Sequence, residues 1–200
     1  MTKMAPSRGF HSDNFWVNKY YDERMERGRM ETAKASKKKR NKETKLKNET
    51  AEIVEISDRI KLLYEKNTKD AYENLQELEA LSEKDDALYL YTDEFIAMLK
   101  NKQYCIRVRG FRLLCKQAKW DDGNKINTAI DDIAAALNDE KPTAIRQALQ
   151  YLMYVVPYKK ELNDKIREAA LSIDLSRLKD TMRPLIAKDI QVLLQLIEEK

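Results

Sequence analysis

Residues that break helices or build catalytic centres are scarce in this sequence. Its 200 residues include four glycines, four prolines, two cysteines and one histidine. Because glycine and proline form most tight turns, few such turns are possible, whereas the helix formers Leu, Ala, Lys and Glu are abundant. With 42% apolar residues, the chain can still bury a core. The composition therefore predicts an all-α protein.

The scarcity of histidine and cysteine excludes most catalytic and metal-binding arrangements. His11, the single histidine, lies in a segment of low apolar content, so the folded part cannot hold a Ser-His-Asp or Cys-His arrangement. No Gly-rich phosphate loop, HExxH or CxxC motif occurs. Cys105 and Cys115 are ten residues apart in one predicted helix, which suits neither a zinc knuckle nor a local disulfide. We expect reduced thiols, no metal, no cofactor and no enzymatic activity.

Long apolar runs are also absent, and the acidic pairs do not resemble catalytic carboxylates. No run approaches the roughly 18 residues that a membrane span needs, and the N-terminus lacks the apolar middle section of a secretory signal. These features predict a cytoplasmic protein that does not bind membranes. Asp121-Asp122 and Asp131-Asp132 are expected on solvated helix ends and faces, because catalytic carboxylates need a pocket that shifts their pKa.

The net charge of +4 hides a basic N-terminal segment. Residues 1 to 50 carry 14 Lys and Arg against 7 Asp and Glu, and the first 52 residues contain almost no Leu, Ile or Val. We therefore expect residues 1 to 52 to form an extension that is disordered or a solvated helix. The most basic stretch of this extension comprises Lys37, Lys38, Lys39 and Arg40. Two roles are open for it: the stretch binds phosphates non-specifically, or it only keeps the extension soluble. A misplaced start codon, with Met25 or Met30 as another start, is a further alternative.

From residue 53 the sequence reads as successive amphipathic helices, which we place at 53–66, 69–82, 85–100, 104–119, 124–138, 142–156, 159–171 and 181–198. Three of them share a motif. "IRVRGFRLL" begins at Ile106, "IRQALQYLM" at Ile145 and "MRPLIAKDI" at Met182, at spacings of 39 and 37 residues. Antiparallel helix pairs that repeat at this period describe a short α-solenoid, in which each pair buries its apolar face against its neighbours. Residues 53 to 200 are predicted to form one such helical-repeat domain.

The repeated motif resembles the second helix of HEAT repeats, in which a Val-Arg pair is followed by small residues and a leucine. The matching positions are Ile106-Arg107 with Gly110 and Leu113, Ile145-Arg146 with Ala148 and Leu152, and Met182-Arg183 with Ile186 and Ile190. The resemblance implies a right-handed, armadillo-like superhelix whose second helices line the concave face.

Residues 53 to 200 also resemble, more narrowly, a group of small bacterial HEAT-like proteins of unassigned role. The stretches that carry this likeness include "AKWDDGNKI", "LNDEKPTAIRQAL" and "DLSRLKDTMRPLIAKDI". Some of these proteins bear a label taken from the Suf iron–sulfur assembly scaffold. That function is not expected here, because two cysteines within a helix and one histidine do not make a cluster-assembly site.

Basic residues recur at i, i+3, i+7 and i+10 on the predicted helix 104–119 and therefore share one face. They are Arg109, Arg112, Lys116 and Lys119. A shift by one repeat places Tyr151 and Tyr158 at equivalent positions, and a shift by two places Lys188 there. The pattern predicts a shallow groove that binds a protein or an acidic peptide. The alternative is an ordinary solvated face, with the tyrosines completing the core between repeats.

The arginines of the repeated motif have a structural interpretation. They are Arg107, Arg146 and Arg183. Because they lie beside the predicted core, each is expected to bond an acidic residue of a neighbouring repeat, such as Asp139 or Asp180. Trp120, at a predicted helix end, is expected to anchor packing rather than to bind a ligand.

Two functions of different classes remain open. The leading hypothesis is a non-enzymatic protein-binding adaptor or scaffold that uses the concave second-helix face, because solenoids expose long surfaces suited to recognition. The alternative is a nucleic-acid-binding protein that uses the basic extension and the stripe from 109 to 119. Residues 51 to 100, with 6 basic and 13 acidic side chains, argue against a continuous basic track. A HEAT-like DNA glycosylase is disfavoured, because no catalytic aspartate in a basic and aromatic pocket can be identified.

Overall fold

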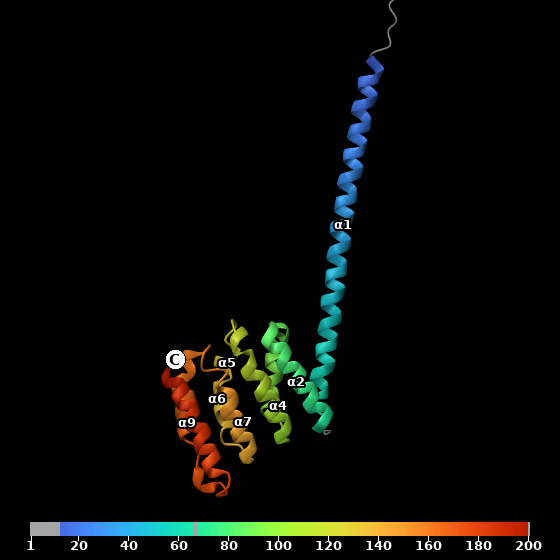
Figure 1. The fold of residues 1–200 in the computed structure, drawn as a ribbon. Coiled ribbons are helices and arrows are strands. Elements are labelled where there is room, and N and C mark those ends of the chain that lie inside the picture. Colours follow the sequence, from blue (N-terminus) through green and yellow to red (C-terminus); the bar gives the residue numbers. More distant parts are fainter. Residues whose placement is uncertain (1–12, 66–67, 200) are drawn as a thin grey trace, which may run out of the picture. The chain divides into compact units, whose positions relative to one another are not determined.

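A computed structural model describes residues 13 to 65 and 68 to 199. Every regular element in these residues is a helix, which confirms the prediction of an all-α protein. The α-helices are α1 (Asp13–Leu62), α2 (Thr68–Lys84), α3 (Thr92–Met98), α4 (Tyr104–Lys116), α5 (Lys125–Thr128), α6 (Ile130–Ala136), α7 (Pro142–Leu152), α8 (Asn163–Leu171) and α9 (Arg183–Glu199) (Figure 1). The short 3-10 helices are η1 (Ala87–Tyr91), η2 (Gln117–Trp120), η3 (Lys160–Leu162) and η4 (Leu175–Arg177).

The chain divides into two compact units, residues 1 to 55 and 56 to 200. This division lies three residues beyond the predicted end of the basic extension. The first unit is helical from Asp13 onward, because no proline occurs between Pro6 and Pro142 and because Lys, Glu, Arg and Ala favour helix. Those of its side chains that the structure describes are exposed, so this part of α1 is a solvated helix. Residues 56 to 62 of α1 belong to the second unit.

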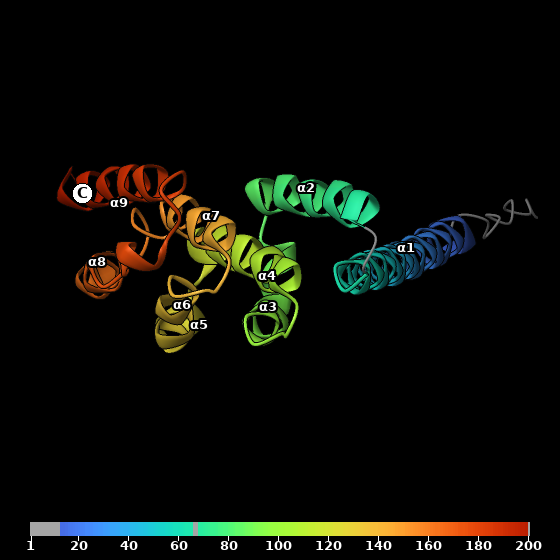
Figure 2. The same cartoon turned by 90° about the horizontal axis from the view of Figure 1, so that it is seen from below.

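The helices of the second unit form two layers (Figure 2). Helices α2, α4, α7 and α9 contact one another in this order, and we call them the second-helix layer. Helices α3, α6 and α8 form the first-helix layer, in which α3 packs on α4, α6 on α7 and α8 on α9. Neighbours along the chain are therefore also neighbours in space, as expected for stacked helix pairs.

The core lies between these two layers and is built from the apolar positions of the repeated motif. The motif positions Ile106, Leu113, Ile145, Leu152, Ile186 and Ile190 are all buried. Within each helix these residues are four or seven positions apart, so they share one helix face. The three copies of the motif therefore bury equivalent faces. The sequence pattern therefore predicted the buried face of α4, α7 and α9.

Four predicted helices are divided or tightened at one end, and one of them, 159–171, is η3 followed by α8. The predicted helix 85–100 is η1 followed by α3, and the predicted helix 104–119 is α4 followed by η2. The predicted helix 124–138 consists of α5 and α6, which meet at Ala129. Tight 3-10 turns are common at helix ends, where the last carbonyls lack α-helical partners. Pro142 and Pro184 lie in the first turns of α7 and α9, where proline is tolerated.

Close packing of α3 on α4 depends on Gly110, the small residue of the first motif. A Cβ atom at this position would lie 2.4 Å from Cβ of Met98 and 2.9 Å from the carbonyl oxygen of Phe95. Both separations are too short for non-bonded atoms, and the carbonyl cannot move without its helix. Any side chain at Gly110 would therefore force α3 and α4 apart.

Candidate functional site

The candidate site lies on the second-helix layer, where α2, α4 and the end of α7 bring charged and aromatic side chains together. Two of the predicted stripe residues, Arg109 and Lys116, are buried, and Arg109 is only 5% exposed. Its Nη1 donates to the carbonyl oxygens of Leu63 at 2.7 Å and Glu65 at 3.0 Å. These carbonyls close the C-terminal end of α1, where backbone acceptors need donors and attract positive charge. The expectation that Arg109 belongs to an exposed stripe is therefore wrong.

Arg112 joins α4 to α2 through a two-point ion pair. Its Nε and Nη2 each donate to a carboxylate oxygen of Glu79, and both separations are 2.7 Å. The guanidinium carbon also lies 4.8 Å from the ring centroid of Tyr151 and 5.6 Å from that of Tyr72. Burial alone lowers the pKa of Arg112, but the bond to Glu79 outweighs it and raises the pKa. Arg112 is thus a fixed cation that orients two tyrosines.

Lys116 makes a similar contact one helical turn further on. Its Nζ lies 2.5 Å from a carboxylate oxygen of Glu83 and 3.7 Å from the ring centroid of Tyr154. Burial alone lowers the pKa of Lys116, but the hydrogen bond from its ammonium group to Glu83 raises it overall. The same hydrogen bond lowers the pKa of Glu83. Two of the four predicted stripe residues, Arg112 and Lys116, are therefore paired with carboxylates of α2.

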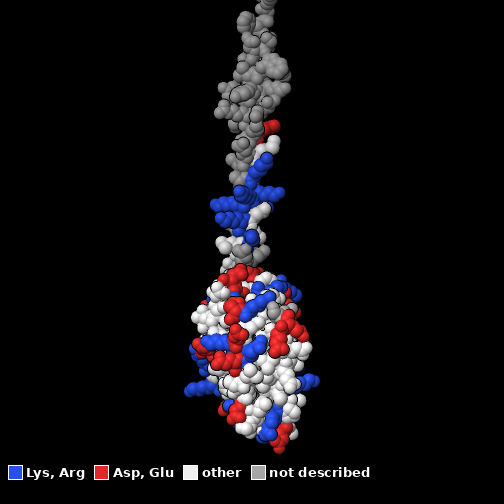
Figure 3. Space-filling view, turned by 90° about the vertical axis from the view of Figure 1, so that its left-hand side faces the viewer, with Lys and Arg blue, Asp and Glu red and all other residues white. Residues whose placement is uncertain are grey.

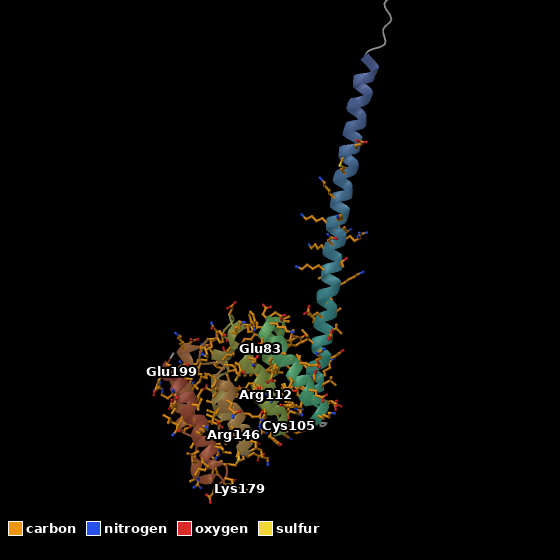
Figure 4. All side chains as sticks on the ribbon, viewed as in Figure 1. Glu83, Cys105, Arg112, Arg146, Lys179 and Glu199 are labelled. Atoms are coloured by element: carbon orange, nitrogen blue, oxygen red, sulfur yellow. The ribbon has the colours of Figure 1, made fainter. Side chains whose placement is uncertain are left out.

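Three tyrosines of this region are exposed to solvent. Tyr72 on α2 is exposed, and so are Tyr154 and Tyr158, at 43% and 53% respectively. The Tyr151 and Tyr154 rings lie 5.5 Å apart, which joins the contacts of Arg112 to those of Lys116. We name the whole set the tyrosine–cation face, which comprises Tyr72, Glu79, Glu83, Arg112, Lys116, Lys119, Tyr151, Tyr154 and Tyr158. Figure 4 labels Glu83 and Arg112, which come from α2 and α4.

Two cavities open on this face. One of about 280 Å³ is lined by Tyr72, Leu75, Tyr104, Cys105, Val108, Arg109, Arg112 and Gln147. The other, of about 180 Å³, is lined by Ser82, Glu83, Lys116, Lys119, Tyr154 and Tyr158. The predicted site residues Lys116, Lys119 and Tyr158 thus meet in one cavity. Trp120 stands beside it, with Nε1 donating to the carbonyl oxygen of Ser82 at 2.8 Å and its ring 4.3 Å from Nζ of Lys119.

The stripe does not continue onto the third repeat in the way that the alignment predicted. Lys188 is exposed on α9, but no contact described by the structure joins it to the tyrosine–cation face. The adjacent Asp189 instead accepts a hydrogen bond from Nε of Arg146 at 2.6 Å. The Asp189 carboxylate of α9 thus contacts α7. The tyrosine–cation face is formed by α2, α4 and the end of α7.

The repeat arginines bind acidic partners, as expected. Nε of Arg107 donates to Asp139 at 2.7 Å, and Asp139 is one of the two acidic residues named as examples of such partners. Nη2 of Arg183 lies 3.2 Å from a carboxylate oxygen of Asp180, but this aspartate is three residues before Arg183 in the sequence rather than in another repeat. The partner of Arg146 is Asp189, whose polar side chain occupies a position that is leucine in the other two motifs. That substitution therefore has a structural reason.

A buried ion pair that the sequence did not reveal lies directly after η2. Asp121 was expected to be solvated, but its side chain is fully buried and lies 3.0 Å from Nζ of Lys159. It accepts further hydrogen bonds from the Tyr89 hydroxyl and from the backbone N–H groups of Lys125 and Ile126. Lys159 follows Asp121 by 38 residues, about one repeat. This spacing is the sequence feature from which the pair could have been predicted. The neighbouring Asp122 is exposed, as expected.

A further cavity, of about 300 Å³, lies between the α3–α4 and α6–α7 pairs. Apolar residues such as Phe111, Ala135 and Ala148 dominate its lining. The cations at its rim are already engaged, because Lys100 pairs with Asp132 and Arg107 with Asp139. The charged groups in its lining thus pair with one another, and the rest of the lining is mainly apolar.

Those basic residues of the N-terminal unit whose side chains the structure describes are exposed on α1. They include all four of the predicted phosphate-binding residues, namely Lys37, Lys38, Lys39 and Arg40. Successive helical residues are about 100° apart, so these four side chains point to all sides of the helix rather than along one face. Figure 3 shows Lys and Arg gathered along the described part of this helix, whereas the visible face of the other unit carries both signs.

Other kinds of site find no support in the residues that the structure describes. Over this part of the chain no three His, Cys, Asp or Glu side chains are placed to hold a metal ion. In the same residues no helix has the length and apolar character of a membrane span. Both cysteines are free thiols, and burial raises the pKa of Cys115 well above its ordinary value. No family model, curated protein or solved structure matches the chain.

Proposed function

We propose that this protein is a non-enzymatic adaptor that binds a partner protein on the tyrosine–cation face. The observation that carries the proposal is the exposure of Tyr72, Tyr154 and Tyr158 beside cations fixed in place by α2 carboxylates. Tyrosine and arginine are enriched at the centres of protein interfaces. Side chains that are already ordered lose little conformational entropy on binding, so such a face suits recognition.

We further propose that residues 56 to 200 form a short right-handed α-solenoid of the HEAT type. The two helical layers, the motif spacing of 37 to 39 residues and the buried equivalent positions support this architecture. The face would then be the concave one, because it belongs to the second-helix layer. Free cysteines suit a reducing compartment, and a cytoplasmic location is part of the proposal.

Capture of the partner from an extract of the source cells tests the adaptor function. Replacing Tyr158 with alanine should weaken capture by about tenfold or more, the loss typical of an exposed aromatic anchor. The matched control is Leu171→Ala, because Leu171 is similarly exposed but lies on α8 in the first-helix layer. If Tyr158→Ala and Tyr154→Ala both retain full capture, the face is not the binding surface.

Nucleic-acid binding through the N-terminal unit is a second candidate, favoured by the exposure of residues 37 to 40. The expected binding is independent of base sequence and weakens steeply with salt, because phosphate contacts release bound counterions. Replacing all four residues with glutamine should abolish binding of a labelled oligonucleotide, measured by fluorescence anisotropy at low and physiological salt. Binding that survives this replacement would contradict a role for these residues.

A further inference from the structure

The smaller cavity of the tyrosine–cation face has the size of a side-chain site. Its volume of about 180 Å³ is below the roughly 300 Å³ at which small-molecule sites begin. Its mouth is open to solvent, because Lys119 and Tyr158 on its lining are both exposed. The cavity therefore has room for one side chain of an approaching protein rather than for a cofactor.

The ion pair that lines this cavity joins one buried and one exposed partner. The side chain of Lys116 is 6% exposed, whereas that of Glu83 is 63% exposed. The ammonium group is also held against the ring of Tyr154, at 3.7 Å from its centroid. Lys116 is therefore fixed, whereas the exposed carboxylate of Glu83 can turn into water once another carboxylate takes its place beside the ammonium group.

We propose that this cavity receives an acidic side chain of the partner protein, and that Glu83 occupies the same position until the partner binds. The inference rests on the proposed function of the face and adds the chemistry of its partner. Lys116 supplies the buried cation, and Lys119 adds a second positive charge at the mouth. A partner carboxylate would take over the hydrogen bond from Lys116, and Glu83 would return to solvent.

The surroundings favour an acidic protein segment over a nucleic acid. Helix α2 carries five acidic residues against two basic ones, and it borders the cavity through Ser82 and Glu83. A nucleic acid presents a continuous row of phosphates and needs a continuous basic track. A single carboxylate needs only the two lysines of the cavity. The cavity therefore offers cations for one carboxylate but no continuous basic track for a phosphate chain.

The test uses the full chain and Trp120 as a fluorescent reporter at the site. The sequence contains two tryptophans, so Trp16→Phe leaves Trp120 as the single one. This background is titrated with a hexaglutamate peptide, and with hexaglutamine and an oligothymidylate as comparison probes. We expect saturable quenching by hexaglutamate and none by hexaglutamine. Equal quenching by both peptides, or tighter binding of the oligothymidylate, would overturn the assignment.

Removing the internal competitor should strengthen binding. Glu83→Gln is expected to lower the hexaglutamate concentration at half-saturation by roughly three- to tenfold, since a charge-assisted hydrogen bond no longer has to be replaced. Glu77→Gln is the matched control, because it makes the same charge change on the same helix while its carboxylate pairs with Arg59 instead. That variant should shift half-saturation by less than about twofold.

Removing the exposed cation should weaken binding. Lys119→Gln is expected to raise the half-saturating concentration by roughly threefold or more, whereas Lys188→Gln on α9 should leave it unchanged. An unchanged or weakened affinity in Glu83→Gln would overturn the inference. If Tyr158→Ala nevertheless abolishes partner capture, the adaptor function stands and only the acidic side-chain site fails. If capture survives Tyr158→Ala, the proposed function itself fails.

Discussion

Replacing Asp121 with alanine is expected to lower the free energy of unfolding by about 3–5 kcal/mol, as when one member of a buried ion pair is removed. The ammonium group of Lys159 would keep only the carbonyl oxygen of Asp121 and Oδ1 of Asn124 as acceptors. The backbone N–H groups of Lys125 and Ile126 would lose their acceptor as well. These lost hydrogen bonds add to the free-energy cost of keeping the Lys159 ammonium group buried without a counter-charge.

Urea-induced unfolding, followed by circular dichroism, measures this effect. Asp122→Ala is the matched control, because the neighbouring Asp122 is exposed and its loss should change stability by less than about 0.5 kcal/mol. If the two variants were equally stable, the buried pair would contribute nothing to the fold.

The same aspartate should make stability depend on acidity. Burial alone raises the pKa of Asp121, but hydrogen bonds from Lys159, Tyr89 and two backbone N–H groups outweigh it and hold the folded-state pKa below the ordinary value. The resulting stabilisation is present above the ordinary aspartate pKa of about 4 and is lost as the pH falls through the folded-state pKa. Asp121→Ala should therefore flatten the acid limb of the stability profile relative to Asp122→Ala.

Replacing Arg109 with methionine is expected to cost about 2–4 kcal/mol of unfolding free energy. The carbonyl oxygens of Leu63 and Glu65 would lose their donor, and each unsatisfied buried group costs about 1–3 kcal/mol. Because this arginine ties the end of α1 to α4, residues 56 to 64 should lose hydrogen-exchange protection more than α7 does.

Arg109→Lys is the companion variant, because it retains a cation with one reachable donor. It should lose less stability than Arg109→Met. If Arg109→Met leaves the hydrogen exchange of residues 56 to 64 unchanged, Arg109 does not hold the end of α1.

Arg109 also shows where prediction from the sequence ends. Helical spacing correctly places it within about 80° of Arg112, Lys116 and Lys119 on the helix circumference. It is buried nonetheless, because the end of α1 covers that edge of α4, and α1 precedes the first recognisable repeat. A repeat alignment describes contacts between repeats, so it carries no information about an element outside them.

The tyrosines reveal a second limit. The pattern predicted Tyr151 and Tyr158 but not Tyr154, because it assumed helical spacing throughout residues 142 to 156. Helix α7 ends at Leu152, and Tyr154 and Tyr158 follow in tight turns whose N–H groups bond the third residue back. The turns, rather than helix periodicity, place Tyr154 over Lys116. By contrast, the sequence predicted an acidic partner from a neighbouring repeat for Arg107, and Asp139 is such a partner, because both residues follow the repeat.

Photo-crosslinking tests the central claim most directly. A photoreactive phenylalanine derivative is placed at Tyr158 in one sample and at Leu171, on the first-helix layer, in another. Illumination in extracts of the source cells should join one protein to position 158, with little product at position 171. Equal crosslinking at both positions, or crosslinking at position 171 alone, would contradict a binding surface on the tyrosine–cation face.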